Sequence, residues 1–176
     1  MSQVETYRET LKDYAKDIRL NLSTLLSVEG SPGLSEKQIA LTALACAYAT
    51  RSRGLSDALL ADSAALLGDA EIEAAKGAAT IMAMNNVFYR TQHFAGNPEL
   101  KKLPPRLRMN IIGKPGIEKA DFEIACLAVS AIGGCEVCVN SHVNEILKAG
   151  MTVEAAHSAI RLAATVQAAS LAEWIG

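Results

Sequence analysis

The sequence of 176 residues is poor in aromatic side chains, nearly balanced in charge and free of long hydrophobic runs. Aromatic residues make up 5% of the chain and hydrophobic residues 50%, so a core must be built from aliphatic side chains and Ala. A formal net charge of −2 provides no basic surface, which argues against a nucleic-acid partner. The uncharged stretches are well short of the roughly 18–20 apolar residues that span a bilayer, so we expect no membrane segment.

The first residues alternate charged and apolar side chains and lack the hydrophobic region of a secretory signal, so we expect a cytoplasmic protein. Cysteine is also scarce. In a reducing compartment, four scattered cysteines are too few for a disulfide scaffold. Two of them nevertheless form the motif Cys135-Glu136-Val137-Cys138, and this CxxC pair is the first sign of chemistry in the sequence.

Apolar residues recur at spacings of three and four along most of the chain, which predicts helices. Ser35 and Gln38 form a predicted capping box before a helix that runs through Thr50, and Gly68 and Gly150 are placed to end helices. No segment alternates convincingly as a strand does, so we predict an all-α fold. One apolar stripe predicts a long first helix containing Tyr7, Leu11, Tyr14, Ile18, Leu22 and Leu25.

The pattern restarts in the second half of the chain, which predicts an internal duplication. A shift of 82 residues aligns Glu36 with Glu118 and Gly68 with Gly150. We expect a single domain over residues 1–176, with a first repeat at about 34–90 and a second at about 117–174. The connector, 91–116, is rich in proline and should hold at most short helical turns.

The duplication provides an internal control for the polar residues of the second repeat. At the shift of 82, the first-repeat positions that match the polar residues of the second repeat carry different amino-acid types. A polar set needed only for packing would recur in both copies, so its restriction to one copy indicates a site. The second-copy residues are Glu123, Cys135, Cys138 and His142, and their first-copy counterparts are Leu41, Arg53, Ser56 and Leu60.

Helical geometry predicts that these four residues converge. Cys135, Cys138 and His142 are spaced to lie on one face of a helix. Glu123 and His142 each lie roughly 12–15 Å from the glycine break at 133–134, so an antiparallel helical hairpin brings them level. Glu123 also stands in an apolar run, where a charge without a partner is costly.

Each residue type suits a thiol–disulfide redox site. The thiolate of a cysteine near a helix N-terminus is favoured by the helix dipole, a His four residues after Cys138 can accept a proton, and a Glu can orient that His. A second thiol condenses with a sulfenic acid on the first and closes a disulfide. The attacking thiol is open at this point, since the dipole favours Cys135 and the spacing to His142 favours Cys138.

The pattern Glu123…Cys135-x-x-Cys138-x-x-x-His142 in a duplicated helical chain resembles the alkylhydroperoxidase D family of the carboxymuconolactone decarboxylase-like superfamily. The resemblance covers most of the chain and implies an antioxidant peroxidase that reduces organic hydroperoxides to alcohols. It also implies a homotrimer and a link to the peroxiredoxin component of alkyl hydroperoxide reductase. The implied electron donor is dihydrolipoamide or a lipoyl-bearing protein, with no bound cofactor, and the sequence has no nucleotide or flavin signature.

Carried over to this sequence, the resemblance implies that Cys138 is the peroxidatic cysteine and Cys135 the resolving one, where the reductant attacks. It makes His142 the proton acceptor and Glu123 the start of the relay. One position departs from the family, whose well-known members have a second His immediately before the peroxidatic cysteine. Val137 stands there, so a water or a direct contact between Glu123 and His142 must replace that step.

Other interpretations stay open at this point. The four residues could bind zinc, or the cysteines could fill a core in a structural oligomer. The family name also allows decarboxylation of a lactone, a reaction without need of a CxxC. Glu123 could instead lie at a solvent edge beside a Lys. We interpret Cys46 and Cys126 as buried and inert, His93 and His157 as structural, and Met82 and Met84 as core residues.

Overall fold

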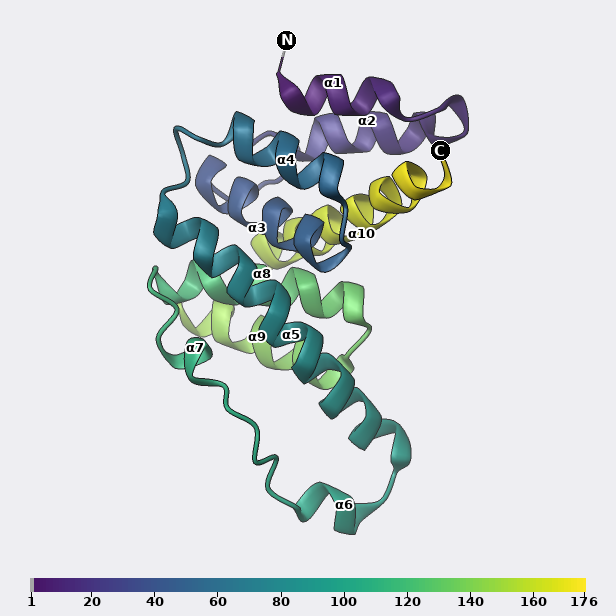
Figure 1. The fold of residues 1–176 in the computed structure, drawn as a ribbon. Coiled ribbons are helices and arrows are strands. Elements are labelled where there is room, and N and C mark those ends of the chain that lie inside the picture. Colours follow the sequence, from purple (N-terminus) through teal and green to yellow (C-terminus); the bar gives the residue numbers. More distant parts are fainter. Residues whose placement is uncertain (1) are drawn as a thin grey trace.

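The computed structural model describes residues 2–176, and every regular element in this range is a helix, which confirms the predicted all-α class (Figure 1). The long helices pack into one body, and the segment carrying α6 extends away from it. In chain order the elements are α1 (Gln3–Thr10), the 3-10 helix η1 (Asp13–Ala15), α2 (Lys16–Leu25), α3 (Glu36–Ala49), α4 (Arg53–Asp62), α5 (Asp69–Ala95), α6 (Pro98–Lys102), α7 (Asn110–Gly113), α8 (Lys119–Gly133), α9 (Glu136–Lys148) and α10 (Val153–Ile175).

Helices α3 and α8 form the centre of the core. Nine consecutive residues of α3, Ile39–Ala47, and ten of α8, Asp121–Ser130, are buried. A helix that is apolar on all sides must be covered on all sides, and α5 and α10 pack against both of them. Their many Ala side chains allow the close packing that a chain with few aromatics needs.

The same order of helices occurs in both halves, α3–α4–α5 and α8–α9–α10, although the duplication itself stays a prediction. The N-cap residues of the two halves do not share a single offset. Ser35 and Glu118 are 83 residues apart, and so are Ser52 and Cys135, instead of the expected 82. Gly68 and Thr152, the N-caps of α5 and α10, are 84 residues apart, so the pairing of Cys135 with Arg53 stays a prediction.

The predicted long first helix is wrong. Leu11 has an extended backbone, and the chain reverses there so that α1 and α2 lie side by side (Figure 1). Arg8 and Arg19 hold the reversal, since the Arg8 side chain donates to the Arg19 carbonyl and the Arg19 side chain to the Leu11 carbonyl. Tyr14, a member of the predicted apolar stripe, is 60% exposed.

Two predicted helix ends have different outcomes. Gly150 has a φ of +85°, in the left-handed region expected of a helix-ending glycine. Gly68 instead has a φ of −85° and is the N-cap residue of α5, so it begins a helix and does not end one. The capping box at Ser35 and Gln38 is confirmed.

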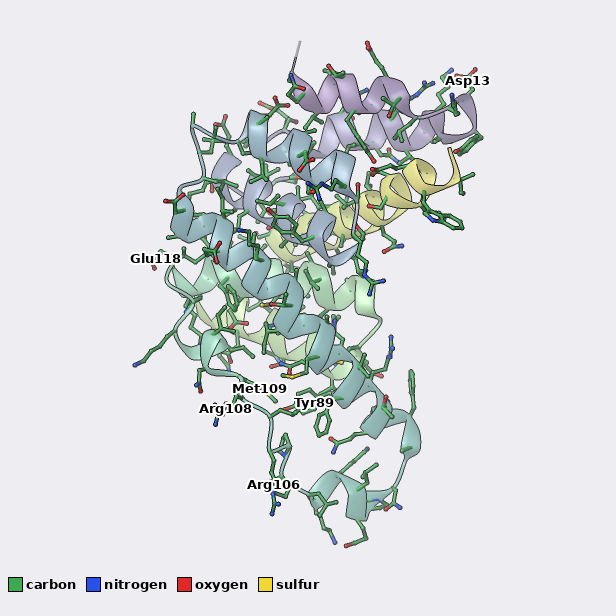
Figure 2. The ribbon with its side chains drawn as sticks, viewed as in Figure 1. Asp13, Tyr89, Arg106, Arg108, Met109 and Glu118 are labelled. Atoms are coloured by element: carbon green, nitrogen blue, oxygen red, sulfur yellow. A yellow bond between two sulfur atoms is a disulfide. The ribbon has the colours of Figure 1, made fainter. Side chains whose placement is uncertain are left out.

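The connector contains only the short helices α6 and α7, as expected, although α5 continues to Ala95. Every residue from 93 to 108 is exposed, and Arg106 and Arg108 project from this segment (Figure 2). Among residues 2–176, no helix combines the length and hydropathy needed to cross a membrane.

Candidate active site

The turn between α8 and α9 places the CxxC motif, and its two glycines have different roles. Gly134 ends α8 with a φ of +63°, a conformation that costs other residues about 1–2 kcal/mol. Gly133 is required by packing, because a Cβ there would lie only 2.8 Å from Cγ of Asn86. Asn86 and Arg90 of α5 anchor this turn, since Asn86 bonds to Val129 and Ser130 and Arg90 donates to the Gly133 carbonyl.

Cys135 and Cys138 form a disulfide, with their Cα atoms 5.3 Å apart. Cys135 is the N-cap of α9, and its sulfur accepts a hydrogen bond from the Cys138 backbone N–H at 3.3 Å. The two cysteines differ in access. Cys135 has no exposed surface, whereas Cys138 is 5% exposed and lines a pocket.

Glu123 and His142 are in direct contact, as the spacing predicts. The Glu123 Oε2 atom lies 2.6 Å from Nδ1 of His142, and the two residues are only 3% and 6% exposed. The alternative of a solvent-edge Glu123 paired with a Lys is therefore wrong. The other ring nitrogen, Nε2, lies 3.2 Å from the sulfur of Met82.

A thioether sulfur carries no proton, so Met82 can only accept a hydrogen bond from His142. The contact is a hydrogen bond when Nε2 carries hydrogen, and the same nitrogen can accept a proton when it carries none. Among residues 2–176, no hydrogen bond joins the imidazole to a cysteine sulfur. His142 must therefore turn, or act through a water, to exchange a proton with the Cys138 thiol.

The pocket beside Cys138 has a volume of about 430 Å³ and contains both members of the Glu123–His142 pair. Its apolar wall comes partly from α5 and partly from the segment before α8. Figure 2 shows Tyr89 and Met109 close together where these two parts meet, and the Tyr89 hydroxyl lies 3.8 Å from the Met109 sulfur. The lining residues are Met82, Asn85, Tyr89, Met109, Ile112, Lys119, Glu123, Val137, Cys138, Ser141, His142 and Glu145.

The sequence interpretation missed the contribution of α5 to this pocket. Met82 was assigned to the core, and although it is buried, it contacts His142 across 60 residues of sequence. Asn85 and Tyr89 line the same pocket. The spacing of these three residues at i, i+3 and i+7 was the available signal, but it does not identify what the helix face contacts.

The remaining cysteines lie outside the pocket. Cys46 and Cys126 are free and fully buried, in agreement with the interpretation that they are inert. Burial raises the pKa of the Cys46 thiol, and burial together with the charge of Glu123 raises the pKa of Cys126. Both thiols are thereby kept in the less reactive protonated form.

Cys135 and Cys138 are joined as a disulfide in this structure, so neither offers a thiolate to a metal ion. Among residues 2–176, no group of three or more His, Cys, Asp or Glu side chains is suitably placed to hold a metal ion.

Glu136, between the two cysteines, is exposed and lies 3.4 Å from Nε2 of His93. His93, which the sequence left without a partner, therefore pairs with the first turn of α9.

Comparison with known proteins identifies the family. The Carboxymuconolactone decarboxylase family model matches residues 98–174. Alkyl hydroperoxide reductase AhpD of Coxiella burnetii (strain RSA 493 / Nine Mile phase I) is 47% identical over 163 residues, covering 93% of this chain and 92% of the relative. The chain belongs to the AhpD family. AhpD proteins of Rhodospirillum centenum and Brucella melitensis are 46% and 43% identical, over 94% and 96% of this chain and 87% and 95% of their own.

AhpD membership agrees with the resemblance drawn from the CxxC motif, and the relatives extend well beyond the segment matched by the family model. Those named relatives are reductases of alkyl hydroperoxides and cover nearly all of the chain. The lactone decarboxylase interpretation rests on the family name alone.

Proposed function

We propose that this chain is an alkyl hydroperoxide reductase of the AhpD type, which reduces organic hydroperoxides to alcohols with its Cys135–Cys138 pair. The observation that carries the proposal is one disulfide in which a single sulfur, that of Cys138, faces a pocket containing a buried carboxylate–imidazole pair. A partly accessible thiol beside a base is the arrangement that peroxide reduction requires.

In the oxidative half of the cycle, the Cys138 thiolate attacks the terminal oxygen of the hydroperoxide. A sulfur–oxygen bond forms, the oxygen–oxygen bond breaks, and the alkoxide takes up a proton and leaves as alcohol. Cys138 is thereby oxidised to a sulfenic acid. Cys135 then attacks this sulfur, expels water and closes the disulfide before further oxidation can occur.

The roles proposed for Glu123 and His142 follow from their contact. Their 2.6 Å hydrogen bond places a base at the pocket without an intervening residue. Val137, where family members often have a relay His, is partly exposed at the pocket wall and has no proton to offer. We therefore assign both proton uptake from Cys138 and proton delivery to the alkoxide to the Glu123–His142 pair.

The reductive half should begin at Cys138, which revises the expectation that the reductant attacks Cys135. Cys135 has no exposed surface, so a thiolate from outside reaches the Cys138 sulfur first. Attack there releases Cys135 as a thiolate, which the Cys138 N–H and the helix dipole stabilise as a leaving group. The second thiol of the donor then displaces Cys138 and restores the dithiol.

A small dithiol such as dihydrolipoamide, or a lipoyl group on another protein, suits this cycle as the electron donor. We propose such a donor, together with a functional link to the peroxiredoxin component of alkyl hydroperoxide reductase. A homotrimer is also proposed, and the exposed apolar side chains Phe94, Leu103 and Trp174 are available to a subunit interface. The cytoplasmic location stays a prediction.

The test is consumption of tert-butyl hydroperoxide by the purified protein in the presence of dihydrolipoamide. Cys135→Ser and Cys138→Ser should each abolish catalytic turnover, and the native protein should lose two thiols per peroxide. Cys46→Ala is the matched control, since Cys46 is remote from the pocket, and it should retain the native rate. Equal turnover in all three variants contradicts the proposal. So does a native protein that shows no turnover with dihydrolipoamide or with a lipoyl-bearing protein as the donor.

A further inference from the structure

Asn85 is a buried polar residue whose side-chain oxygen has no hydrogen-bond partner in the part of the chain that the structure describes. It is 4% exposed, and its Oδ1 atom has no hydrogen-bond partner among residues 2–176. A buried amide without a hydrogen bond is destabilising by an amount similar to the whole contribution of a good hydrogen bond. Such a group in an otherwise well-packed helix therefore needs an explanation.

The adjacent residue, Asn86, is a buried Asn whose side chain has a structural role. Asn86 is also buried, and its carboxamide donates to the Val129 carbonyl and accepts from the Ser130 hydroxyl. Its role in holding α8 is complete without any ligand. Asn85 points from a different side of the same helix, and among the described residues no donor bonds to its Oδ1 atom.

Asn85 is one of the residues that line the pocket of the redox site. Asn85 lines the pocket together with Cys138 and His142, and its own backbone oxygen lies 3.9 Å from the Cys138 sulfur. Met82 and Tyr89, one turn before and after it on α5, line the same wall. Asn85 thus places a carboxamide residue between Met82 and Tyr89 on the side of α5 that lines the pocket, next to the Cys138 sulfur.

We infer that Asn85 binds the hydroperoxyl group of the substrate. This inference rests on the proposed function of the same site. A hydroperoxide has one O–H donor and acceptor lone pairs on both oxygens, and a carboxamide offers one acceptor and two donor hydrogens. Oδ1 is buried in the substrate-free protein, so the carboxamide turns toward the pocket when the hydroperoxide enters. Oδ1 then accepts from the terminal O–H and Nδ2 donates to the substrate oxygens, so the terminal oxygen is directed toward Cys138.

The same contacts follow the reaction to its products. As the sulfur–oxygen bond forms and the oxygen–oxygen bond breaks, negative charge develops on the oxygen bonded to carbon. The Nδ2 hydrogens stabilise that charge until the alkoxide is protonated by the Glu123–His142 pair, while Oδ1 keeps the hydrogen bond to the new sulfenic acid. The carboxamide takes no proton or electron, so the balance of the step is unchanged.

The experiment separates the two half-reactions in Asn85→Ala and in Asn85→Leu, which fills the same space without polar atoms. We expect both variants to lower the second-order rate constant of the reduced protein with tert-butyl hydroperoxide by about 10- to 100-fold. Oxidation of the same dithiol by diamide, which has no hydroperoxyl group, should change less than twofold. Reduction of the disulfide by dihydrolipoamide should also change less than twofold.

Asn86→Ala serves as the structural comparison, and only its melting temperature is compared. Asn86→Ala should lower the melting temperature, whereas Asn85→Ala should leave it unchanged or raise it.

A native rate with tert-butyl hydroperoxide in both Asn85 variants overturns the inference while leaving the proposed function intact. An equal loss with hydroperoxide and diamide also overturns it, because the carboxamide then acts on the thiols. A native protein without peroxide turnover overturns the proposed function and the inference together.

Discussion

Glu123 is a carboxylate on the most apolar helix of the molecule, and the contact with His142 is what makes its burial tolerable. Its sequence neighbours Phe122 and Ile124 have no exposed surface. Removing one member of a buried ionic pair leaves the other without compensation, which typically costs 3–5 kcal/mol. The cost of an unpartnered charge was the argument by which the sequence predicted a partner, and the structure provides that partner.

The Glu123→Gln substitution tests the role of this carboxylate without changing its size. The amide carries no negative charge, so it cannot orient His142 as the carboxylate does or support proton transfer by the imidazole. The rate with tert-butyl hydroperoxide should therefore fall by about 10²- to 10⁴-fold. Stopped-flow measurement of thiol loss in a single turnover gives that rate. Oxidation by diamide also needs the Cys138 thiolate and should slow too, but by less, because it requires no proton delivery to an alkoxide. A native rate with hydroperoxide would remove Glu123 from the mechanism.

At the scale of an element, the α8–α9 turn decides where the reactive cysteines lie. The glycine break and the helix starting at Cys135 were both predictable, because glycine pairs end helices and the following residue can cap the next one. The reason for glycine at position 133 was not predictable. It depends on Asn86, a residue of another helix that packs where a Cβ would be.

A double-mutant cycle measures this close approach. Gly133→Ala should lower the free energy of unfolding by about 1–3 kcal/mol, because the Asn86 side chain must move away from the new methyl group. In the Asn86→Ala background the cost should be smaller but not zero, since Cβ of Asn86 also lies 2.9 Å from the built position. Urea unfolding followed by circular dichroism gives the four free energies. Strict additivity would show that the two positions are independent.

The whole molecule is organised around α3 and α8, and each of these helices holds a free cysteine. Cys46 and Cys126 have no exposed surface, and burial raises the pKa of both thiols. Their thiolate fraction at neutral pH is therefore small, and a reagent reaches them only when the core opens. The two thiols are consequently reporters of global stability and not of the redox cycle.

Iodoacetamide labelling of the oxidised protein at pH 8 should therefore proceed only through unfolding. Labelling of Cys46 and Cys126 should accelerate with urea. The free energy of opening calculated from the labelling rates should fall with urea concentration at the same slope as the free energy of unfolding measured at equilibrium. Peptide mapping by mass spectrometry identifies the labelled residue. Rapid labelling of Cys126 without urea would instead indicate local opening of α8 beside Glu123.

The sequence by itself determined the helical class, the main helices of each half, the CxxC motif and the pairing of Glu123 with His142. These follow from local periodicity, helix caps and the cost of a buried charge, which act over one or two helices. Tertiary structure decided that Cys138 and not Cys135 faces the pocket, that the first stripe folds back at Leu11, and that α5 supplies Met82 and Asn85 to the site. A helical period defines a face but not its neighbour, and contacts 53 and 60 residues apart in sequence depend on how whole helices pack.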